Sequence, residues 1–175
     1  MASKRRNKTQ ETTEKVDPEA WAGIADATKD RSSCVQPIGD FYGDPSEDCL
    51  FINVYTKKLR GKVPVIVFFH AGGWFSQTAR SDTLGPHYLV DKDVVVVTAN
   101  YRLGALGFLS TGDEHAVGNY GMKDQVMALR WVRDNIGEFG GDSGMVTIAG
   151  YSVGSTSVVL HMLSPMSKVE KLDIK

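Results

Sequence analysis

The most informative segment of the chain is Met145-Val-Thr-Ile-Ala-Gly-Tyr-Ser-Val-Gly154. Its first five residues are apolar or β-branched and predict a buried strand, and a helical pattern follows the segment. Between them lies Gly-x-Ser-x-Gly, from Gly150 through Ser152 to Gly154. In a sharp strand-to-helix turn, glycines at these positions avoid collisions with neighbouring backbone, and the serine hydroxyl is presented at the edge of the sheet. Ser152 is therefore a candidate nucleophile.

A second glycine-rich segment predicts the groups that would stabilise an oxyanion. His70-Ala-Gly-Gly-Trp74 directly follows the apolar run that ends at Phe69. Consecutive glycines let backbone N–H groups approach a ligand without interference from Cβ atoms. Taken alone, each of the two patterns is also typical of a plain glycine turn. Together they predict an oxyanion hole formed by the N–H groups of Gly72, Gly73 and Val153.

The upstream sequence repeats the alternation of strand and helix. Short runs rich in β-branched or aromatic residues predict strands at 50–55, 63–69, 94–99 and 145–149. The second and third of these are almost entirely apolar, as in strands buried on both faces. Apolar residues at helical spacing predict an amphipathic helix from Asn119 to Ile136, ended by Gly137. The pattern indicates an α/β fold with a mostly parallel central sheet flanked by helices.

Composition excludes several classes of protein. The chain has 175 residues, 42% of them hydrophobic and 23% charged, with a net charge of −1. A balance so close to neutral gives no support for a nucleic-acid partner. No apolar run approaches the length needed to span a bilayer, so no membrane span is predicted. Two cysteines are too few for a disulfide scaffold but enough for one bridge.

Several motifs occur in the same order as in one known family. They are EDCLFINVY at 47–55, HAGGW at 70–74, NYRLG at 100–104, GFLS at 107–110, GNYG at 118–121, FGGD at 139–142 and the Gly-x-Ser-x-Gly segment. Through them the sequence resembles the type-B carboxylesterase family, the carboxylesterase and cholinesterase branch of the α/β-hydrolases. The ending His161-Met-Leu-Ser-Pro165 looks most like insect members.

The resemblance implies a serine carboxylic-ester hydrolase that acts on small-molecule carboxylic esters through an acyl-enzyme. Ser152 matches the family's nucleophile, and Gly72, Gly73 and Val153 match its oxyanion donors. No metal ion or organic cofactor is implied. Family members are commonly secreted or pass through the secretory pathway, whereas this sequence shows no signal peptide, so its location stays open.

The resemblance also implies that Cys34 and Cys49 form a disulfide. Such a bridge would close a loop of about 15 residues and contribute roughly 3 kcal/mol in an oxidising compartment. Two free buried thiols are the alternative, since no signal sequence is evident.

Five positions depart from the family pattern. Tyr151 stands where an acidic residue is usual, Val153 and Ser155 replace smaller residues, Ala71 replaces the first of three glycines, and Ser143 replaces a proline. None of these changes removes the candidate nucleophile. They are expected to alter the shape of the pocket.

A different class of serine enzyme is also suggested by three residues. Asp142-Ser143-Gly144 matches the nucleophile segment of chymotrypsin-like proteases. Those proteases are β-barrel proteins, whereas this chain has the rhythm of a parallel sheet. We therefore interpret the three residues as a turn before the last strand.

The expected organisation is a disordered polar leader at 1–17, a partial carboxylesterase domain at 18–168, and a tail at 169–175 that is unlike the family. In this fold the triad acid and histidine follow the serine along the chain. Too little sequence follows Ser152 to hold them, and before Trp21 the polar leader stands where the family has its first strands. Compared with the family, the chain is therefore expected to be truncated at both ends.

None of the four histidines is a good substitute for the missing base. His70 is expected to shape the glycine loop, His87 and His115 fall in predicted surface loops, and His161 is over two helical turns from Ser152. The chain is therefore expected to be a serine esterase by family that is itself inactive. The alternative is a non-catalytic, cholinesterase-like binding or adhesion fragment.

Overall fold

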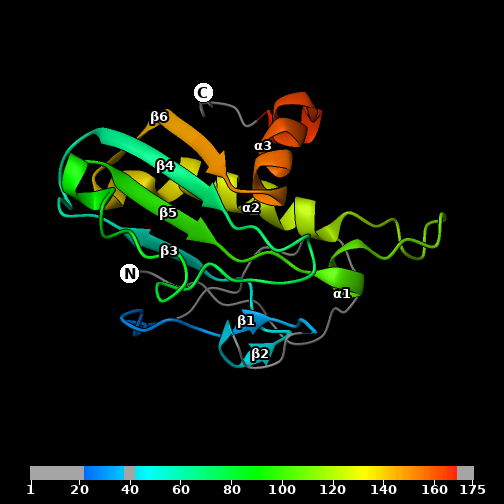
Figure 1. The fold of residues 1–175 in the computed structure, drawn as a ribbon. Helices are drawn as coiled ribbons and strands as arrows, with labels where there is room; N and C mark the ends of the chain where they lie inside the picture. Colours follow the sequence, from blue (N-terminus) through cyan, green and yellow to red (C-terminus); the bar gives the residue numbers. More distant parts are fainter. Residues whose placement is uncertain (1–21, 38–41, 169–175) are drawn as a thin grey trace.

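A four-stranded sheet forms the centre of the molecule (Figure 1). The computed structural model describes residues 22–37 and 42–168. The strands are β3 (Ile52–Tyr55), β4 (Val63–Phe69), β5 (Val95–Ala99) and β6 (Gly141–Gly150), in the order β3-β5-β4-β6. β4 pairs in parallel with both β5 and β6, while β3 is antiparallel to β5. The predicted α/β fold with a mostly parallel sheet is confirmed.

One face of the sheet is covered by the helix α2 (Tyr120–Asn135), which lies behind the strands in Figure 1. The helix is amphipathic, and its buried residues Leu129 and Val132 pack with Val65 and Val67 of β4 in the main hydrophobic core. Burial of this apolar stripe stabilises the helix on the sheet more than its intrinsic propensity does. The predicted helix is confirmed to within one residue at each end.

The end of this helical region differs from the prediction. The α-helix stops at Asn135, but the chain continues as a 3-10 helix, η3 (Ile136–Phe139). The residue that ends the helical path is Gly140, which has a left-handed φ of 78°. Gly137 lies inside η3 without a positive φ, so the predicted stop signal was placed three residues too early.

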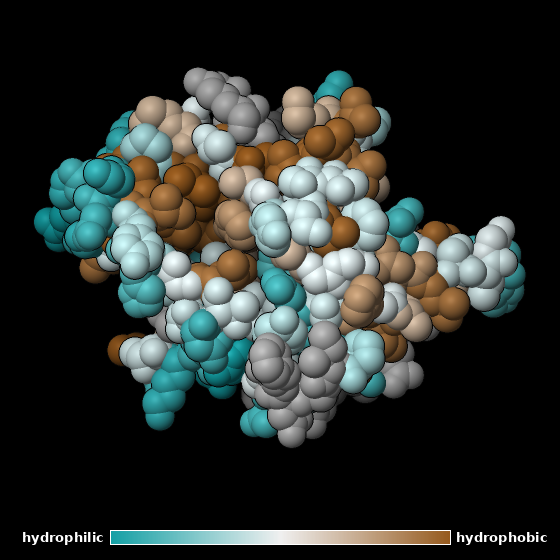
Figure 2. Space-filling view, viewed as in Figure 1, coloured by the Kyte–Doolittle hydropathy of each residue, from teal (hydrophilic) through white to brown (hydrophobic). Residues whose placement is uncertain are grey.

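Burial of the strands is uneven. All five residues of β5 are buried, as predicted for a strand covered on both faces. In β4 only one face is fully buried, by Val65, Val67 and Phe69, while Ile66 and Phe68 on the other face are half-buried. Figure 2 shows the resulting apolar surface over β4 and β6. The prediction of two buried faces was therefore wrong for β4, because α2 covers only the face that carries Val65 and Val67.

The strand β6 begins earlier than predicted. Asp142-Ser143-Gly144 lies inside β6, not in a turn before it. The register is irregular there, since Val63 pairs with Gly141 but Val65 pairs with Val146. The extra residues of β6 form a bulge, in which the Gly144 N–H donates to Asp142 Oδ1 at 2.8 Å. The chain does bend at Asp142 and Gly144, as these residue types predict, but the bend is a bulge inside β6 and not a turn before it.

The remaining elements connect and flank the strands of the sheet. They are β1 (Ser33–Cys34), β2 (Pro45–Ser46), η2 (Val90–Lys92), α1 (Gly104–Phe108), α3 (Val153–Leu163) and η4 (Pro165–Ser167). α3 follows directly from the end of β6 and rises beside it (Figure 1). Within the described ranges, no helix has the length and apolar character needed to span a bilayer. The predicted leader at 1–17 and tail at 169–175 lie outside the described residues.

Candidate active site

Ser152 occupies a sharp turn between the end of β6 and the start of α3. Its backbone has φ 55° and ψ −124°, an uncommon conformation for a residue with a side chain. A Cβ on Gly150 would lie 2.3 Å from the carbonyl carbon of Gly154, and a Cβ on Gly154 would lie 2.1 Å from the carbonyl oxygen of Phe69. Backbone atoms are the obstacle in both cases, which explains the two glycines around the serine.

The turn exposes Ser152 at the first turn of a helix. The serine is solvent-exposed, and its carbonyl accepts from the N–H groups of Ser155 and Thr156 at 2.9 and 3.2 Å. α3 begins at Val153, and the first N–H groups of a helix have no carbonyl partner within it. The turn therefore combines an exposed hydroxyl with the positive end of a helix.

The glycine loop leaves the neighbouring strand beside this turn. Phe69, the last residue of β4, is in register with Gly150 of β6. Gly72, Gly73 and Trp74 then follow with successive positive φ values of 103°, 64° and 62°. A Cβ on Gly72 would lie 2.0 Å from the carbonyl oxygen of Ser76, so this position requires glycine.

The loop is closed by carbonyl groups and not by the N–H groups of its two glycines. The Gly72 carbonyl accepts from the N–H groups of Phe75 and Ser76 at 3.0 and 2.9 Å. The N–H groups of Gly72 and Gly73 donate no hydrogen bond to any residue in the described ranges. A pair of unsatisfied backbone donors thus lies in the loop.

Direct contacts join the loop to the serine turn. Besides its approach to Phe69, a Cβ on Gly154 would lie 3.0 Å from the carbonyl oxygen of His70. The Trp74 indole Nε1 donates to the Ser157 hydroxyl of α3 at 3.2 Å. The two segments singled out in the sequence are therefore adjacent in space, although about 80 residues separate them.

His70 is part of the loop's internal support. The side chain is buried, its Nδ1 hydrogen-bonds the Ala71 carbonyl at 2.8 Å, and its ring stacks on Tyr101 with centroids 4.2 Å apart. The Tyr101 hydroxyl in turn donates to the His70 carbonyl at 2.9 Å. Burial lowers the pKa of His70 to about 4, so the ring is neutral near pH 7. These contacts agree with the predicted role of His70 in shaping the loop.

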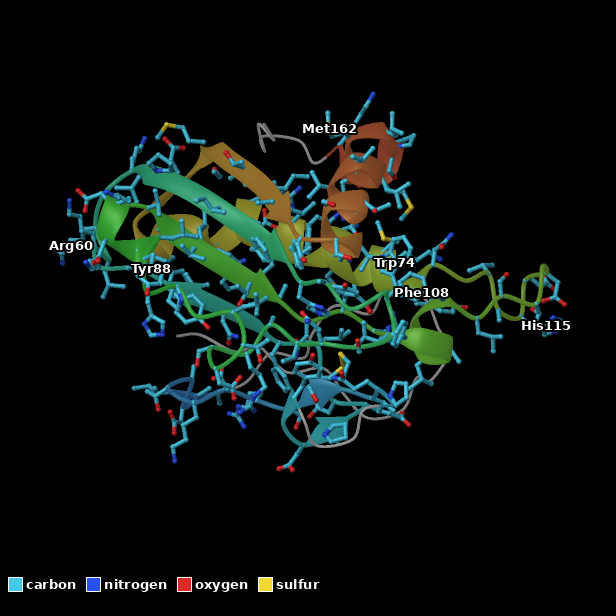
Figure 3. The ribbon with its side chains drawn as sticks, in the orientation of Figure 1. Arg60, Trp74, Tyr88, Phe108, His115 and Met162 are labelled. Atoms are coloured by element: carbon cyan, nitrogen blue, oxygen red, sulfur yellow. A yellow bond between two sulfur atoms is a disulfide. The ribbon has the colours of Figure 1, made fainter. Side chains whose placement is uncertain are left out.

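The other histidines are engaged elsewhere or exposed. Both ring nitrogens of buried His161 have partners at 2.8 Å, Nε2 with Gln125 Oε1 and Nδ1 with the Ser167 hydroxyl. His115 is exposed at the tip of a loop that extends away from α3 (Figure 3), and His87 is also exposed. The chain has four histidines, all of them in the described ranges, and no hydrogen bond joins any of them to the Ser152 side chain.

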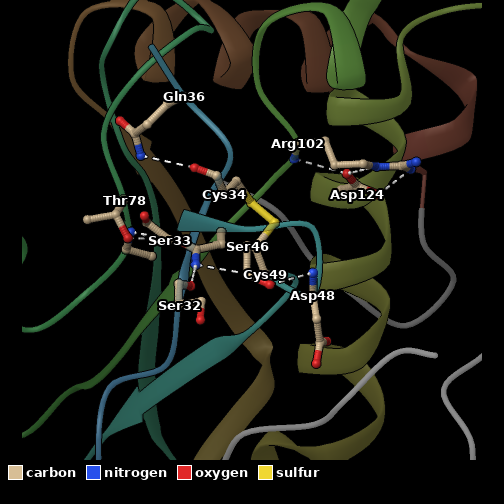
Figure 4. Close-up of a disulfide and its surroundings, with 12 residues drawn as sticks. Ser32, Ser33, Cys34, Gln36, Ser46, Asp48, Cys49, Thr78, Arg102 and Asp124 are labelled. Carbon is tan, nitrogen blue, oxygen red and sulfur yellow. Dashed lines mark hydrogen bonds and ion pairs between the residues drawn. A yellow bond between two sulfur atoms is a disulfide. The ribbon is translucent and has the colours of Figure 1, made fainter. Parts of the chain in front are cut away.

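The predicted disulfide between Cys34 and Cys49 is confirmed (Figure 4). Both cysteines are buried in a small second core with Tyr101 and Leu103, against which Trp74 packs. The disulfide is thus linked to the glycine loop through shared apolar contacts.

Sequence analysis missed a buried ion pair near the disulfide. Arg102 and Asp124 form two side-chain bonds of 2.7 Å, and the Arg102 N–H adds a third at 3.1 Å (Figure 4). The pair ties the segment after β5 to α2, and only 2% of the Asp124 side chain is exposed. Both residues fall within or beside the quoted motifs, but nothing local in the sequence indicates that they pair.

Comparison with known proteins agrees with this geometry. Residues 13–172 match the Carboxylesterase family. The chain is 52% identical to juvenile hormone esterase of Tribolium castaneum over 157 residues, which cover 86% of the chain and 26% of that protein. It is 48% identical to esterase E4 of Myzus persicae over 160 residues, 85% of the chain and 28% of that protein.

A mammalian relative gives the same result. The chain is 46% identical to cocaine esterase of Oryctolagus cuniculus over 165 residues, 86% of the chain and 31% of that protein. The matched region thus spans between about a quarter and a third of the length of these relatives. Its extent and identity place the chain in the carboxylesterase family.

Proposed function

We propose that Ser152 is the nucleophile of a serine hydrolase that cleaves small carboxylic esters. Its hydroxyl oxygen would attack the ester carbonyl and form a tetrahedral oxyanion. Collapse would expel the alcohol and leave an acyl-serine, which water would hydrolyse to the acid and free serine. The observation that carries this proposal is the strained backbone of Ser152, in a turn where neither flanking glycine has room for a Cβ.

The proposed oxyanion hole consists of the N–H groups of Gly72, Gly73 and Val153. Support comes from the two glycine N–H groups, which bind no described residue, and from the position of Val153 at the start of α3. Preorganised donors of this kind contribute on the order of 10²–10³-fold to turnover.

We further propose that residues 1–175 alone do not turn over esters. Proton transfer to and from Ser152 requires a general base, and each described histidine is buried with other partners or exposed without a hydrogen bond to the serine. Without the base, turnover in serine hydrolases falls by about 10⁶-fold.

The test combines covalent labelling with turnover. Residues 1–175 are incubated with a fluorophosphonate probe and, separately, with p-nitrophenyl acetate. Slow labelling confined to Ser152, absent in Ser152→Ala and retained in Ser155→Ala, is expected, together with no Ser152-dependent turnover. Labelling that persists in Ser152→Ala would refute the nucleophile. Rapid, Ser152-dependent turnover would instead refute the inactivity of this chain.

A further inference from the structure

We infer that Trp74 and Ser157 are positioning residues, whose hydrogen bond holds the glycine loop on helix α3. The catalytic meaning of this inference rests on the proposed function, because the loop carries two proposed oxyanion donors and α3 carries the third. Trp74 directly follows Gly73, and its indole N–H donates to Ser157 Oγ at 3.2 Å. Gly154 of α3 also packs closely against the carbonyl groups of Phe69 and His70. Among the described residues, the bond from Trp74 to Ser157 is the hydrogen bond that directly joins the loop to the helix.

Trp74 is held by its backbone as well as its side chain. Its φ of 62° is unfavourable for a residue with a Cβ and persists only where surrounding contacts enforce it. The Trp74 carbonyl accepts from the Gly104 N–H at 2.7 Å. The ring lies beside Phe108, with centroids 6.1 Å apart (Figure 3). Trp74 is therefore a fixed point immediately after the proposed donors.

Ser157 is placed to receive the indole. It is completely buried on α3, and its oxygen accepts from Trp74 Nε1 and from Gln125 Nε2, the latter at 3.4 Å. Two acceptor sites of the oxygen are then filled, and the hydroxyl donates to the sulfur of Met122, with Oγ and Sδ 3.8 Å apart. The Ser157 hydroxyl thus uses all of its hydrogen-bonding groups, and these three bonds fix the orientation of its side chain.

The direction of the Gln125 amide is fixed by the next residue in the network. In the tautomer that carries its hydrogen on Nε2, His161 donates to Gln125 Oε1 at 2.8 Å, and the amide nitrogen of Gln125 then faces Ser157. In the same tautomer, His161 Nδ1 accepts from the Ser167 hydroxyl at 2.8 Å. With this tautomer the donors run in one direction, from Ser167 through His161 and Gln125 to Ser157. The network thus reaches the same Ser157 oxygen that accepts from the Trp74 indole of the glycine loop.

The consequence for chemistry is geometric. Oxyanion donors act only when they lie about 2.7–3.1 Å from the charge that develops, and a misplacement of about 1 Å can cost 10²-fold. The N–H groups of Gly72 and Gly73 move with the loop, whereas that of Val153 moves with α3. A hydrogen bond between the loop and the helix therefore fixes the positions of the Gly72 and Gly73 N–H groups relative to that of Val153.

The test measures loop mobility and Ser152 reactivity in the whole chain. Trp74→Phe keeps an aromatic ring but removes the indole N–H, and Ser157→Ala removes the acceptor. Trp131→Phe is the matched control, because Trp131 packs on Phe139 and its indole has no described hydrogen-bond partner. Amide hydrogen exchange over residues 71–77 is expected to rise at least about tenfold in the first two variants and to stay unchanged in the third.

A second readout separates positioning from simple packing. The rate of fluorophosphonate labelling at Ser152 is expected to fall about 10–100-fold in Trp74→Phe and in Ser157→Ala, with no further fall in the double variant. Equal rates of amide hydrogen exchange over residues 71–77 in Trp74→Phe and the parent chain would show that the Trp74–Ser157 bond, the proposed tether, does not hold the loop. Faster loop exchange with an unchanged labelling rate would overturn the positioning role.

Failure of the proposed function is distinguishable from failure of this inference. A parent chain that is never labelled at Ser152 would refute the nucleophile, while hydrogen exchange would still decide whether the tether exists. If Ser157→Ala does not fold by circular dichroism, Trp74→Phe carries the test, since it leaves the buried serine in place. The ¹⁵N-labelled indole resonance of Trp74 is expected to move in Ser157→Ala and not in Trp131→Phe.

Discussion

Replacing Gly154 by alanine tests the steric basis of the serine turn. The new Cβ would lie 2.1 Å from the carbonyl oxygen of Phe69 and 3.0 Å from that of His70, whereas ordinary contacts begin at about 3.4 Å. Because both obstacles are backbone atoms, α3 and the end of β4 would have to separate by about 1 Å. Overpacking of this kind costs typically 1–3 kcal/mol, and we expect about 3 kcal/mol here because no side chain can rotate away.

The measurement is the free energy of unfolding in urea, followed by circular dichroism. Gly137→Ala is the matched control, since a Cβ there meets nothing within 4 Å and the residue has no positive φ. That variant is expected to be neutral or more stable by about 0.4–1 kcal/mol, because alanine restricts the unfolded chain. The steric reasoning is refuted if Gly154→Ala unfolds within about 0.5 kcal/mol of the parent chain.

Three other changes have outcomes that the structure determines. Asp124→Asn leaves the mostly buried Arg102 guanidinium without its counter-charge, so urea unfolding is expected to show a loss of about 3 kcal/mol. Reduction of the Cys34–Cys49 disulfide frees a loop with a sequence separation of 15, and the urea midpoint is expected to fall by the equivalent of about 3 kcal/mol. Burial lowers the pKa of His161 from 6.5 to about 4, so the unfolded chain binds that proton first. Its contribution to stability is complete above about pH 6.5 and is lost as the pH falls toward 4, by at most about 1.4 kcal/mol per pH unit. Burial lowers the pKa of His70 to about 4 as well, so urea unfolding across this range is expected to show up to about twice that slope in the parent chain and about half of the parent slope in His161→Gln.

Each of these predictions has a control in the same chain. Asp134→Asn breaks an exposed pair with Arg133 and is expected to change stability by less than about 1 kcal/mol, and an equal effect at both sites would contradict the role of burial. A chain with both cysteines changed to alanine must not respond to reductant. His161→Gln removes the titrating ring itself, and a slope that equals that of the parent chain would contradict the contribution of His161.

Local patterns in the sequence predicted the elements of the fold well. The apolar run at 63–69 is β4, and the helix expected from Asn119 to Ile136 is α2. These patterns are reliable because a residue that packs in the core has to be apolar, so burial leaves a continuous apolar run in the strand and a helical spacing of apolar residues in α2. Prediction failed where two local signals compete. At Asp142–Gly144 the turn residues are real, but pairing with β4 resumes around them and absorbs the turn into β6.

Long-range polar contacts could not be predicted in this way. Arg102 and Asp124 are 22 residues apart, and Trp74 and Ser157 are 83 apart, so no periodic pattern brings either pair together. Arginine, aspartate and serine are also common on exposed surfaces. Only the packing of α2 and α3 against the loops after β4 and β5 decides that these side chains meet in the interior.

In the candidate site, the serine turn could be predicted from the sequence, whereas the hydrogen bond between Trp74 and Ser157 could not. Ser152 and its two glycines form a local backbone device, and glycine is required there because neighbouring carbonyls occupy the space of a Cβ. Such a requirement leaves a short, fixed spacing in the sequence. The hydrogen bond from Trp74 to Ser157 requires no fixed separation in the sequence, since a hydroxyl on any helix that packs beside the Trp74 indole could accept it. Reactive groups built from backbone conformation are therefore readable from sequence, whereas the side chains that align them emerge only from the packed structure.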